Sequence, residues 1–304
     1  MDNLYQDYAP ETLKRLRRIS YMMLRDFQTL CQRHSIRYFA VGGTCLGALR
    51  HGGIIPWDDD IDLGMPRKDF ERFQQVAETE FPGKYSLLCC EKEPRWPFFS
   101  MRWCLKGTEF REDALQAFPM PLGIFLDLYC WENLADDEAL SRRQWIRAWF
   151  WGKLLTLREV AHPVLYARGF RRTLLSFACS IGHCVLRLAP RSFLRRRAQA
   201  WSLRFRDVET ARMAQLFEPK PFLSAIRKDE VFPTRTVPFD GMTIDIPGNA
   251  EAYLTQFFGP NWSEMPPPEK RHNHPPLRLS FGPWEKVADG TAAPSTISPE
   301  GNTP

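Results

Sequence analysis

The stretch 41–63, VGGTCLGALRHGGIIPWDDDIDL, contains a glycine pair, a short helical piece and then four aspartates within five positions. If residues 60–63 form a strand, the period of two places Asp60 and Asp62 on one face and turns Ile61 and Leu63 into the core. Two adjacent carboxylates repel each other unless they share a proton or a cation, and Mg2+ accepts carboxylate oxygens, usually together with substrate phosphates. We therefore interpret this stretch as a metal site suited to phosphoryl chemistry.

The glycine pair in front of the aspartates has two interpretations. Gly42 and Gly43 follow a predicted buried strand at 37–41, and Thr44 can cap the helical piece that runs through Leu49. The backbone N–H groups of Gly43 and Thr44 would then lie at a helix N-terminus, where phosphate oxygens bind well. The alternative is a simple tight turn, and only the downstream aspartates favour the phosphate interpretation.

Apolar periodicity and turn residues predict the other elements. Helices are expected at 10–34, 67–81 and 250–258, and strand candidates lie at 84–90, 98–105 and 124–131. Residues 236–247 predict a β-hairpin around Asp240-Gly241. The third strand candidate carries one acid, Asp127, in an otherwise apolar run. That carboxylate either binds metal, pairs with another group, or faces a loop, because burying it alone is costly.

Length and composition are those of a soluble globular chain. With 304 residues and 44% hydrophobic content, the chain can bury a sizeable core. No uncharged apolar stretch reaches the about 20 residues of a spanning helix, and no secretion signal is recognised. The eight cysteines show no CxxC pair, so we expect free thiols and no zinc site in a cytoplasmic protein.

Basic charge is concentrated in one segment. Residues 141–206 carry fifteen Arg and Lys and one acid, Glu159, a net charge of +14 against +5 for the whole chain. Leucines and aromatic residues lie among these arginines in a predicted helical region at 135–215. Such helices suit an anionic membrane surface, which would place the protein on the inner face of the cell membrane; the alternative is a solvated helical subdomain with an aromatic core. No recognisable nucleic-acid module is present, and no nucleic-acid partner is expected.

The segment PPPEKRHNH at 266–274 also has two interpretations. It is either a flexible basic tail or a cationic flap that closes on a phosphate through Arg271 and His272. From Trp284 onward, polar, small and proline-rich residues indicate disorder.

With these residues in view, the stretch GGTCLGALRHGGIIPWDDDIDLGMPRKDFERF at 42–73 resembles the LicD family of phosphocholine transferases, relatives of the fukutin-type phosphopolyol transferases. GIFLDLY at 123–129 looks like the second acidic strand of that family. GMTIDIPGNAEAYLTQFFGPNW at 241–262, with EKRHNH, looks like its closing block, so the resemblance covers about 20–275. Two departures concern acceptor recognition: Arg102 is followed by Trp103 rather than an acid, and Cys130, Trp131 and Glu132 replace the usual proline and acidic turn.

The resemblance implies an α+β fold of the nucleotidyltransferase type, a mixed sheet flanked by helices, with the basic helical subdomain inserted. The expected divisions are a catalytic core at 1–134, the basic insertion at 135–215, the C-terminal part of the core at 216–283 and a disordered tail at 284–304. It also implies transfer of phosphocholine, or a similar phosphoalcohol, from CDP-choline or another CDP-alcohol to a sugar hydroxyl of a surface glycan or its lipid-linked precursor.

The implied site has one group of metal ligands and one group of substrate contacts. Mg2+ or Mn2+ would be held by Asp60, Asp62 and Asp127, with Asp127 either a second-metal ligand or the acceptor of the hydroxyl proton. Asp58 and Asp59 rank below these, as candidate turn residues. The expected substrate contacts are Gly42, Gly43, Thr44, Arg50, His51, Arg102, Arg271 and His272. Two alternatives stay open: transfer of a nucleotide to a sugar, small molecule or RNA, and a non-catalytic, membrane-attached scaffold for glycan assembly.

Overall fold

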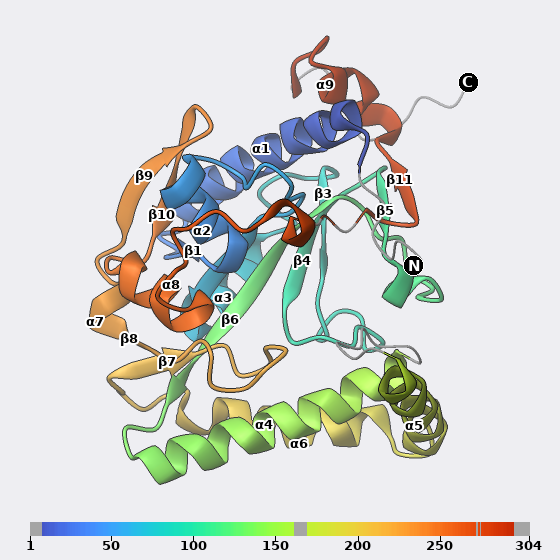
Figure 1. Cartoon of the computed structure of the whole chain (residues 1–304), viewed down its shortest axis with the longest axis vertical. Coiled ribbons are helices and arrows are strands. Elements are labelled where there is room, and N and C mark those ends of the chain that lie inside the picture. The colour runs from blue at the N-terminus through green and yellow to red at the C-terminus, as the bar shows by residue number, and fades with distance from the viewer. Residues whose placement is uncertain (1–7, 161–168, 272, 274, 295–304) are drawn as a thin grey trace.

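The protein is described from a computed structural model, which covers residues 8–160, 169–271, 273 and 275–294 (Figure 1). Its centre is a mixed sheet with strand order β1-β2-β6-β4-β3. The bounds of these strands are β1 Phe39–Ala40, β2 Asp62–Pro66, β6 Phe125–Leu134, β4 Met101–Leu105 and β3 Tyr85–Leu88. β2 and β6 are parallel, whereas the other pairs on this path are antiparallel. The expected α+β architecture with a mixed sheet and flanking helices is confirmed.

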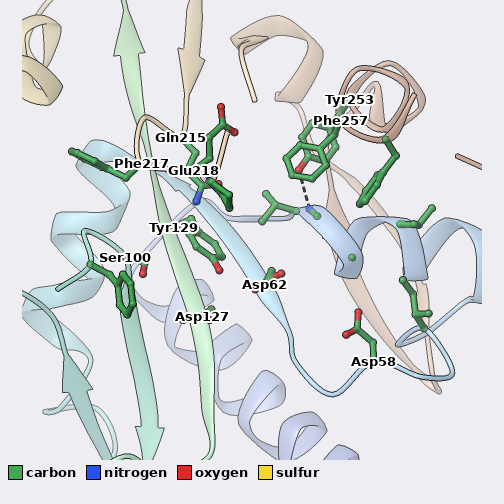
Figure 2. A pocket seen from close by; sticks show the side chains of 18 of the residues that line it. Asp58, Asp62, Ser100, Asp127, Tyr129, Gln215, Phe217, Glu218, Tyr253 and Phe257 are labelled. Atoms are coloured by element: carbon green, nitrogen blue, oxygen red, sulfur yellow. Dashed lines mark hydrogen bonds between the residues drawn. The ribbon is translucent and has the colours of Figure 1, made fainter. Parts of the chain in front are cut away.

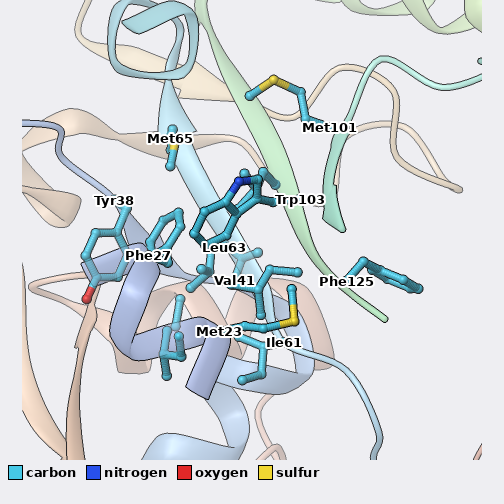
Figure 3. Packing of buried hydrophobic residues seen from close by; sticks show 14 of the residues in the cluster. Met23, Phe27, Tyr38, Val41, Ile61, Leu63, Met65, Met101, Trp103 and Phe125 are labelled. Atoms are coloured by element: carbon cyan, nitrogen blue, oxygen red, sulfur yellow. The ribbon is translucent and has the colours of Figure 1, made fainter. Parts of the chain in front are cut away.

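Helices α1 (Pro10–Arg33) and α3 (Arg67–Val76) contact the central strands. Figure 3 shows Met23 and Phe27 of α1 beside Ile61, Leu63 and Trp103 of the sheet region. These five side chains are fully buried, and the indole Nε1 of Trp103 donates to the carbonyl of Ala77. Burial of Ile61 and Leu63 is the packing expected from the alternation in 60–63, and it holds β2 in one register.

The C-terminal part of the chain returns beside α2 (Gly42–His51). It forms the hairpin of β9 (Arg235–Phe239) and β10 (Met242–Ile246), followed by α8 (Ala250–Phe258). The hairpin turns at Asp240 and Gly241, both of which have positive φ angles (46° and 78°), as a two-residue hairpin loop requires. The hairpin and the helix at 250–258 are therefore confirmed.

The basic segment forms three helices at one end of the molecule (Figure 1): α4 (Glu138–Glu159), α5 (Phe170–Leu186) and α6 (Arg191–Ser202). A second, smaller core joins α4 to the sheet; it contains Leu134, Trp145, Ala148, Ala214 and Leu216. Strand β7 (Arg212–Ala214) then pairs with the end of β6, so the sheet resumes inside the range expected to be helical.

The remaining elements are short. They are β5 Glu109–Arg111, β8 Ile226–Arg227, α7 Lys228–Val231, β11 Arg278–Ser280, α9 Glu285–Asp289 and single 3₁₀ turns at Asp113–Leu115, Leu203–Phe205, Pro268–Lys270 and Gly282–Trp284.

One expectation is wrong over part of its length: the tail does not become disordered at Trp284. The side chain of Trp284 is 1% exposed, and its Nε1 donates to the carbonyl of Lys106. Helix α9 follows and lies against α1, where Arg15 pairs with Asp289 at 2.8 Å. A single buried indole thus outweighs the polar composition around it. Residues 295–304 lie outside the described part of the chain.

Candidate active site

The aspartates of the opening stretch meet Asp127 across the parallel strands β2 and β6. Asp62 and Asp127 are register partners, and the N–H of Asp127 donates to the carbonyl of Ile61 at 3.1 Å. Because paired residues in a sheet point to the same face, the two carboxylates lie side by side. Figure 2 shows both, with Asp58, in the wall of one cavity.

Burial and mutual repulsion raise the pKa of these carboxyls. For Asp60 and Asp62 the pKa is well above its usual value, chiefly because of burial and then because of the neighbouring aspartates. The pKa of Asp127 is also raised by burial, with Arg102 opposing the shift. Tyr129, two residues along β6 and on the same face, lowers the pKa of both Asp62 and Asp127. Protons alone would leave this cluster neutral; a cation would let it ionise.

The residues present fit a divalent cation. Asp62 Oδ1 is buried and has no hydrogen-bond partner among the described residues, so it is an acceptor in need of a positive ligand. Carboxylate oxygens are the donors that Mg2+ and Mn2+ prefer. Asp60, Asp62 and Asp127 are the predicted ligands, and Asp58 offers a further carboxylate on the cavity wall.

Within the described residues, the acids whose carboxylate oxygens lie within 4.8 Å of one another are Asp58, Asp59 and Asp60, a group that includes neither Asp62 nor Asp127. Asp59, however, accepts a hydrogen bond from the hydroxyl of Tyr8 at 2.6 Å. The lining of the described cavity includes Asp58 and Asp62 but not Asp59 or Asp60. This placement favours Asp62 as the central ligand and gives Asp58 more weight than sequence reasoning gave it.

Arg102 is held by acids rather than being a free arm. Its Nε lies 3.1 Å from Asp127 Oδ1, and its Nη1 pairs with Glu112. The guanidinium also lies 3.8 Å from the ring centre of Phe125. Burial acts to lower the pKa of Arg102, but Asp127 and Glu112 outweigh it and raise the pKa above its usual range. Arg102 therefore orients Asp127 and carries a fixed positive charge at the cavity wall.

The glycine pair lies against the aspartates. A Cβ on Gly43 would come within 2.8 Å of Asp58 Oδ2, and one on Gly42 within 3.5 Å of Asp62 Oδ2. Helix α2 begins at Gly42, so Thr44 is inside its first turn and not its cap. The Gly42 N–H donates to the hydroxyl of Tyr253 at 2.8 Å, while the Thr44 hydroxyl accepts from the Asp62 N–H at 2.8 Å. The pair thus admits the carboxylates, and Thr44 positions Asp62; phosphate binding by Gly43 stays a prediction.

Arg50 and His51 lie at the other end of α2. Arg50 Nη1 donates to the carbonyls of Trp262 (3.1 Å) and Glu264 (3.0 Å), which fixes the loop after α8 beside the cavity. Arg50 Nε donates to His51 Nε2 at 3.0 Å. Burial, followed by the charge of Arg50, lowers the pKa of His51. A neutral His51 that supports Arg50 explains this contact without a catalytic role.

The structure describes only part of the predicted basic flap at 266–274. Arg271 Nε donates to the carbonyl of Pro266 at 2.8 Å, and its guanidinium lies 5.2 Å from the ring centre of Trp57. Lys270 lines the cavity, whereas His272 lies outside the described residues. Arg271 therefore braces the segment through Trp57, and Lys270 is the basic residue of the segment that reaches the cavity wall.

Sequence reasoning missed the far wall of the cavity, which has a volume of about 950 Å³. α4 supplies Trp149 and Lys153, and the loop after β7 supplies Glu218. Glu218 is 1% exposed; its Oε1 accepts from the Leu223 N–H at 2.9 Å, and burial raises its pKa to about 7. No local pattern marks these residues. Tyr129, in contrast, could have been found from its two-residue spacing to Asp127.

Comparison with known proteins gives this geometry a context. The family model described as "LicD/FKTN/FKRP, nucleotidyltransferase domain" matches residues 35–121. A lipopolysaccharide cholinephosphotransferase, LicD of Haemophilus influenzae, is 41% identical over 80 residues, which are 26% of this chain and 30% of that protein. Human ribitol 5-phosphate transferase FKRP is 49% identical over 45 residues, 15% of this chain and 9% of that protein.

Two limits follow from these lengths. The similarity spans less than a third of the curated relatives, including an uncharacterized protein of Rickettsia typhi that is 45% identical over 18% of its length. The family model also ends at residue 121, before Asp127. The opening block with its glycines and aspartates lies inside the match, and the resemblance seen in that block is confirmed. Residues 35–121 of this chain are thus similar to the LicD/FKTN/FKRP nucleotidyltransferase domain.

Proposed function

We propose that this chain is a metal-dependent transferase that moves phosphocholine, or a similar phosphoalcohol, from a CDP-alcohol to a sugar hydroxyl of a glycan or its lipid-linked precursor. One observation carries the proposal: Asp62 and Asp127 are register partners on a cavity wall, and Asp62 Oδ1 is buried without a partner among the described residues. The names of the relatives, a cholinephosphotransferase and a ribitol 5-phosphate transferase, support the reaction class.

The proposed chemistry assigns one task to each group of residues. Asp62 and Asp127, with Asp60 or Asp58, would hold Mg2+ or Mn2+. When bound, that cation supplies charge neutralisation on the diphosphate as CMP departs. Arg102 fixes the orientation of Asp127 through Nε, and Thr44 fixes the backbone of Asp62.

The acceptor hydroxyl must lose a proton as the new phosphate ester bond forms. Asp127, whose Oδ1 is held by Arg102 Nε, would either accept that proton or serve as a metal ligand. Arg50, Lys153 and Lys270 lie around the cavity and would attract the anionic donor. The cavity is large enough for a nucleotide and part of an acceptor together.

A product assay tests the proposal. The purified full chain is incubated with CDP-choline or other CDP-alcohols, Mg2+ or Mn2+ and a glycan extract, and CMP release is followed. We expect CMP only when donor, acceptor and metal are all present, and none in EDTA. Asp62→Asn should abolish release, whereas Asp69→Asn is the matched control. Asp69 has the same 8% exposure as Asp127 and also pairs with an arginine, Arg37, but it is absent from the cavity lining.

The same assay separates the two alternatives. Nucleotide transfer, which the description of the matching family model favours, would release pyrophosphate from a nucleoside triphosphate instead of CMP from a CDP-alcohol. A non-catalytic scaffold would release neither product and would be indifferent to EDTA. Either result would replace the proposed reaction.

A further inference from the structure

Helix α5 carries a stripe of large apolar side chains that face solvent. The stripe is formed by Leu174 (56% exposed), Phe177 (65%), Ile181 (50%), Val185 (59%) and, just past the helix, Leu188 (86%). Successive members are three or four residues apart, so they lie along one side of the helix. Single exposed leucines are ordinary on soluble proteins, but a contiguous row of five marks a surface that meets another apolar phase.

The opposite side of α5 is occupied by α4. Gly182 lies where a Cβ would be 3.1 Å from Leu157 Cδ2 of α4, and His183 Nδ1 lies 2.9 Å from the carbonyl of Leu157. The apolar stripe therefore lies on the side of α5 that faces away from α4 and the rest of the protein. Figure 1 shows α5 at an outer corner of the molecule, beside one end of α4.

The segment that contains the stripe carries exposed arginines, and its one acid, Glu159, is ion-paired. Glu159 pairs with Arg158 and also with Arg191, whose Nε lies 2.7 Å away. Arg187 and Arg196 are exposed, and no ion pair is recorded for either among the described residues. The surface thus combines an apolar row with a net positive charge and almost no acids, which fits the headgroups and acyl boundary of an anionic bilayer.

An exposed aromatic side chain lies on α6, the next helix along the chain. Phe193 of α6 is 42% exposed and packs edge-on against Trp151 of α4, with ring centres 5.8 Å apart. The guanidinium of Arg197 lies 5.4 Å from the Trp151 ring centre. Amphipathic rings beside arginines are typical of protein segments at the membrane interface.

We infer that the outer side of α5, with Phe193 and the surrounding arginines, binds the surface of an anionic lipid bilayer, with α5 lying in the plane of the headgroups. A second copy of this chain is a poorer occupant, because pairing two such faces would bring two strongly basic segments together. Nucleic acid would use the arginines but would leave the apolar row exposed. The helix lies in the surface rather than across it: within the described residues no single helix has the length and apolar composition of a span, and the α5–α6 region meets that standard only as a pair bent by 105°.

Membrane binding by α5 would also orient the cavity. α4, on which α5 rests, contributes Trp149, Gly152, Lys153 and Thr156 to the cavity wall. The active-site cavity and the bilayer-binding surface thus share one helix. If the proposed transfer reaction is correct, this arrangement favours a lipid-linked acceptor, although binding to vesicles does not depend on that reaction.

Flotation with vesicles tests the inference on the full chain. Vesicles of phosphatidylcholine alone are compared with vesicles that contain about one-third phosphatidylglycerol. We expect the protein to float with the anionic vesicles and to remain in solution with the neutral ones. The double variant Phe177→Asp/Ile181→Asp should lose about tenfold or more in binding. Leu277→Asp, at a leucine that is 52% exposed on another part of the molecule, should bind as the parent does.

Further measurements keep the outcomes distinct. Circular dichroism and thermal unfolding should show both variants folded, since the changed positions face solvent. Arg187→Glu/Arg196→Glu should weaken binding and reduce its salt dependence. The inference is overturned if the parent protein ignores anionic vesicles, or if the α5 double variant binds them normally. It is also overturned if the parent protein does not bind vesicles and light scattering shows that the parent is a dimer and the double variant a monomer. Binding of RNA, without binding of vesicles, would overturn it as well.

Discussion

Asp62 of β2 and Asp127 of β6 are register partners in the only parallel strand pair along the described path of the central sheet. Sixty-five positions separate them in the chain, yet the pleat turns both carboxylates to the same side. Burial raises the pKa of both carboxyls; the charge of Asp127 raises the pKa of Asp62 further, and Arg102 opposes the shift at Asp127. Ionising both carboxylates destabilises the fold unless a cation binds between them. The pair is therefore suited to binding a cation.

Replacement of Asp62 should separate catalysis from stability. Asp62→Asn is expected to lower kcat/KM by about 10³-fold or more, equivalent to about 4 kcal/mol of transition-state stabilisation. The same change should raise the melting temperature in EDTA, because a buried, repelled carboxylate is replaced by a neutral side chain. Asp69→Asn should do the reverse: it should lower stability, by weakening the ion pair with Arg37, and leave kcat/KM near that of the parent. An active Asp62→Asn enzyme would exclude Asp62 as a metal ligand.

The stability of the metal-free protein should depend on pH in a defined direction. Raised pKa values at Asp60, Asp62 and Asp127 mean that the folded state holds protons that the unfolded chain releases near pH 4. Their contribution to stability is complete below that pH and is lost as pH rises through the folded-state pKa values. Thermal unfolding in EDTA should therefore show a loss of stability as the pH rises above about 4, and this loss should be smaller in Asp62→Asn.

Added Mg2+ or Mn2+ should offset that loss, and more so at pH 8 than at pH 5, because the metal competes with protons for the same oxygens. Equal stabilisation of the parent and of Asp62→Asn at both pH values would show that the ion binds elsewhere.

Thr44 should matter through its hydroxyl. In Thr44→Val, the Asp62 N–H loses its acceptor in a buried position, which should cost about 1–3 kcal/mol of unfolding free energy in a urea titration. Thr44→Ser keeps the oxygen and should recover most of that loss. If Ser and Val behave alike, the contribution of Thr44 is packing by its methyl group and not the hydrogen bond.

The ionisation of Glu218 can be followed by comparing the stability of the parent protein with that of Glu218→Gln at different pH values. Its pKa of about 7 reflects burial, so ionisation above neutral pH destabilises the folded state. Glu218→Gln, which keeps an oxygen for the Leu223 N–H, should be more stable than the parent at pH 8.5 by at most about 3 kcal/mol. The gap should close below about pH 4, where Glu218 is protonated in both the folded and the unfolded state. A gap that stays constant with pH would assign the effect to shape and not to charge.

The elements that could be predicted from the sequence are those set by local chemistry. Alternation placed Ile61 and Leu63 in the core, the Asp240-Gly241 dipeptide gave the hairpin, and Gly259 ended the helix at 250–258. The predicted ends of two elements differ from the observed ends. The helix expected at 67–81 ends at Val76, and the strand expected at 124–131 continues to Leu134, where β7 pairs with it.

Several features of the site depend on contacts that no local pattern records. Pairing of β2 with β6 sets the register of Asp62 and Asp127, and the approach of Glu112 turns Arg102 from a predicted phosphate contact into a fixed partner of Asp127. Glu218 reaches the cavity only because β7 returns to the edge of β6. The sequence identifies Asp62 and Asp127 as candidate ligands. The contacts that shift their pKa values depend on the tertiary structure.

The hydroxyl of Tyr253 receives the N–H of Gly42, so the first turn of the helix beside the aspartates is secured by a residue 211 positions downstream. A fragment trimmed to 35–121 would lack that anchor and would also lack β6, the strand against which β2 is aligned. The smallest unit that folds cooperatively is accordingly larger than residues 35–121, the part that matches the family model. Shortened versions made for crystallisation or engineering need to retain α8.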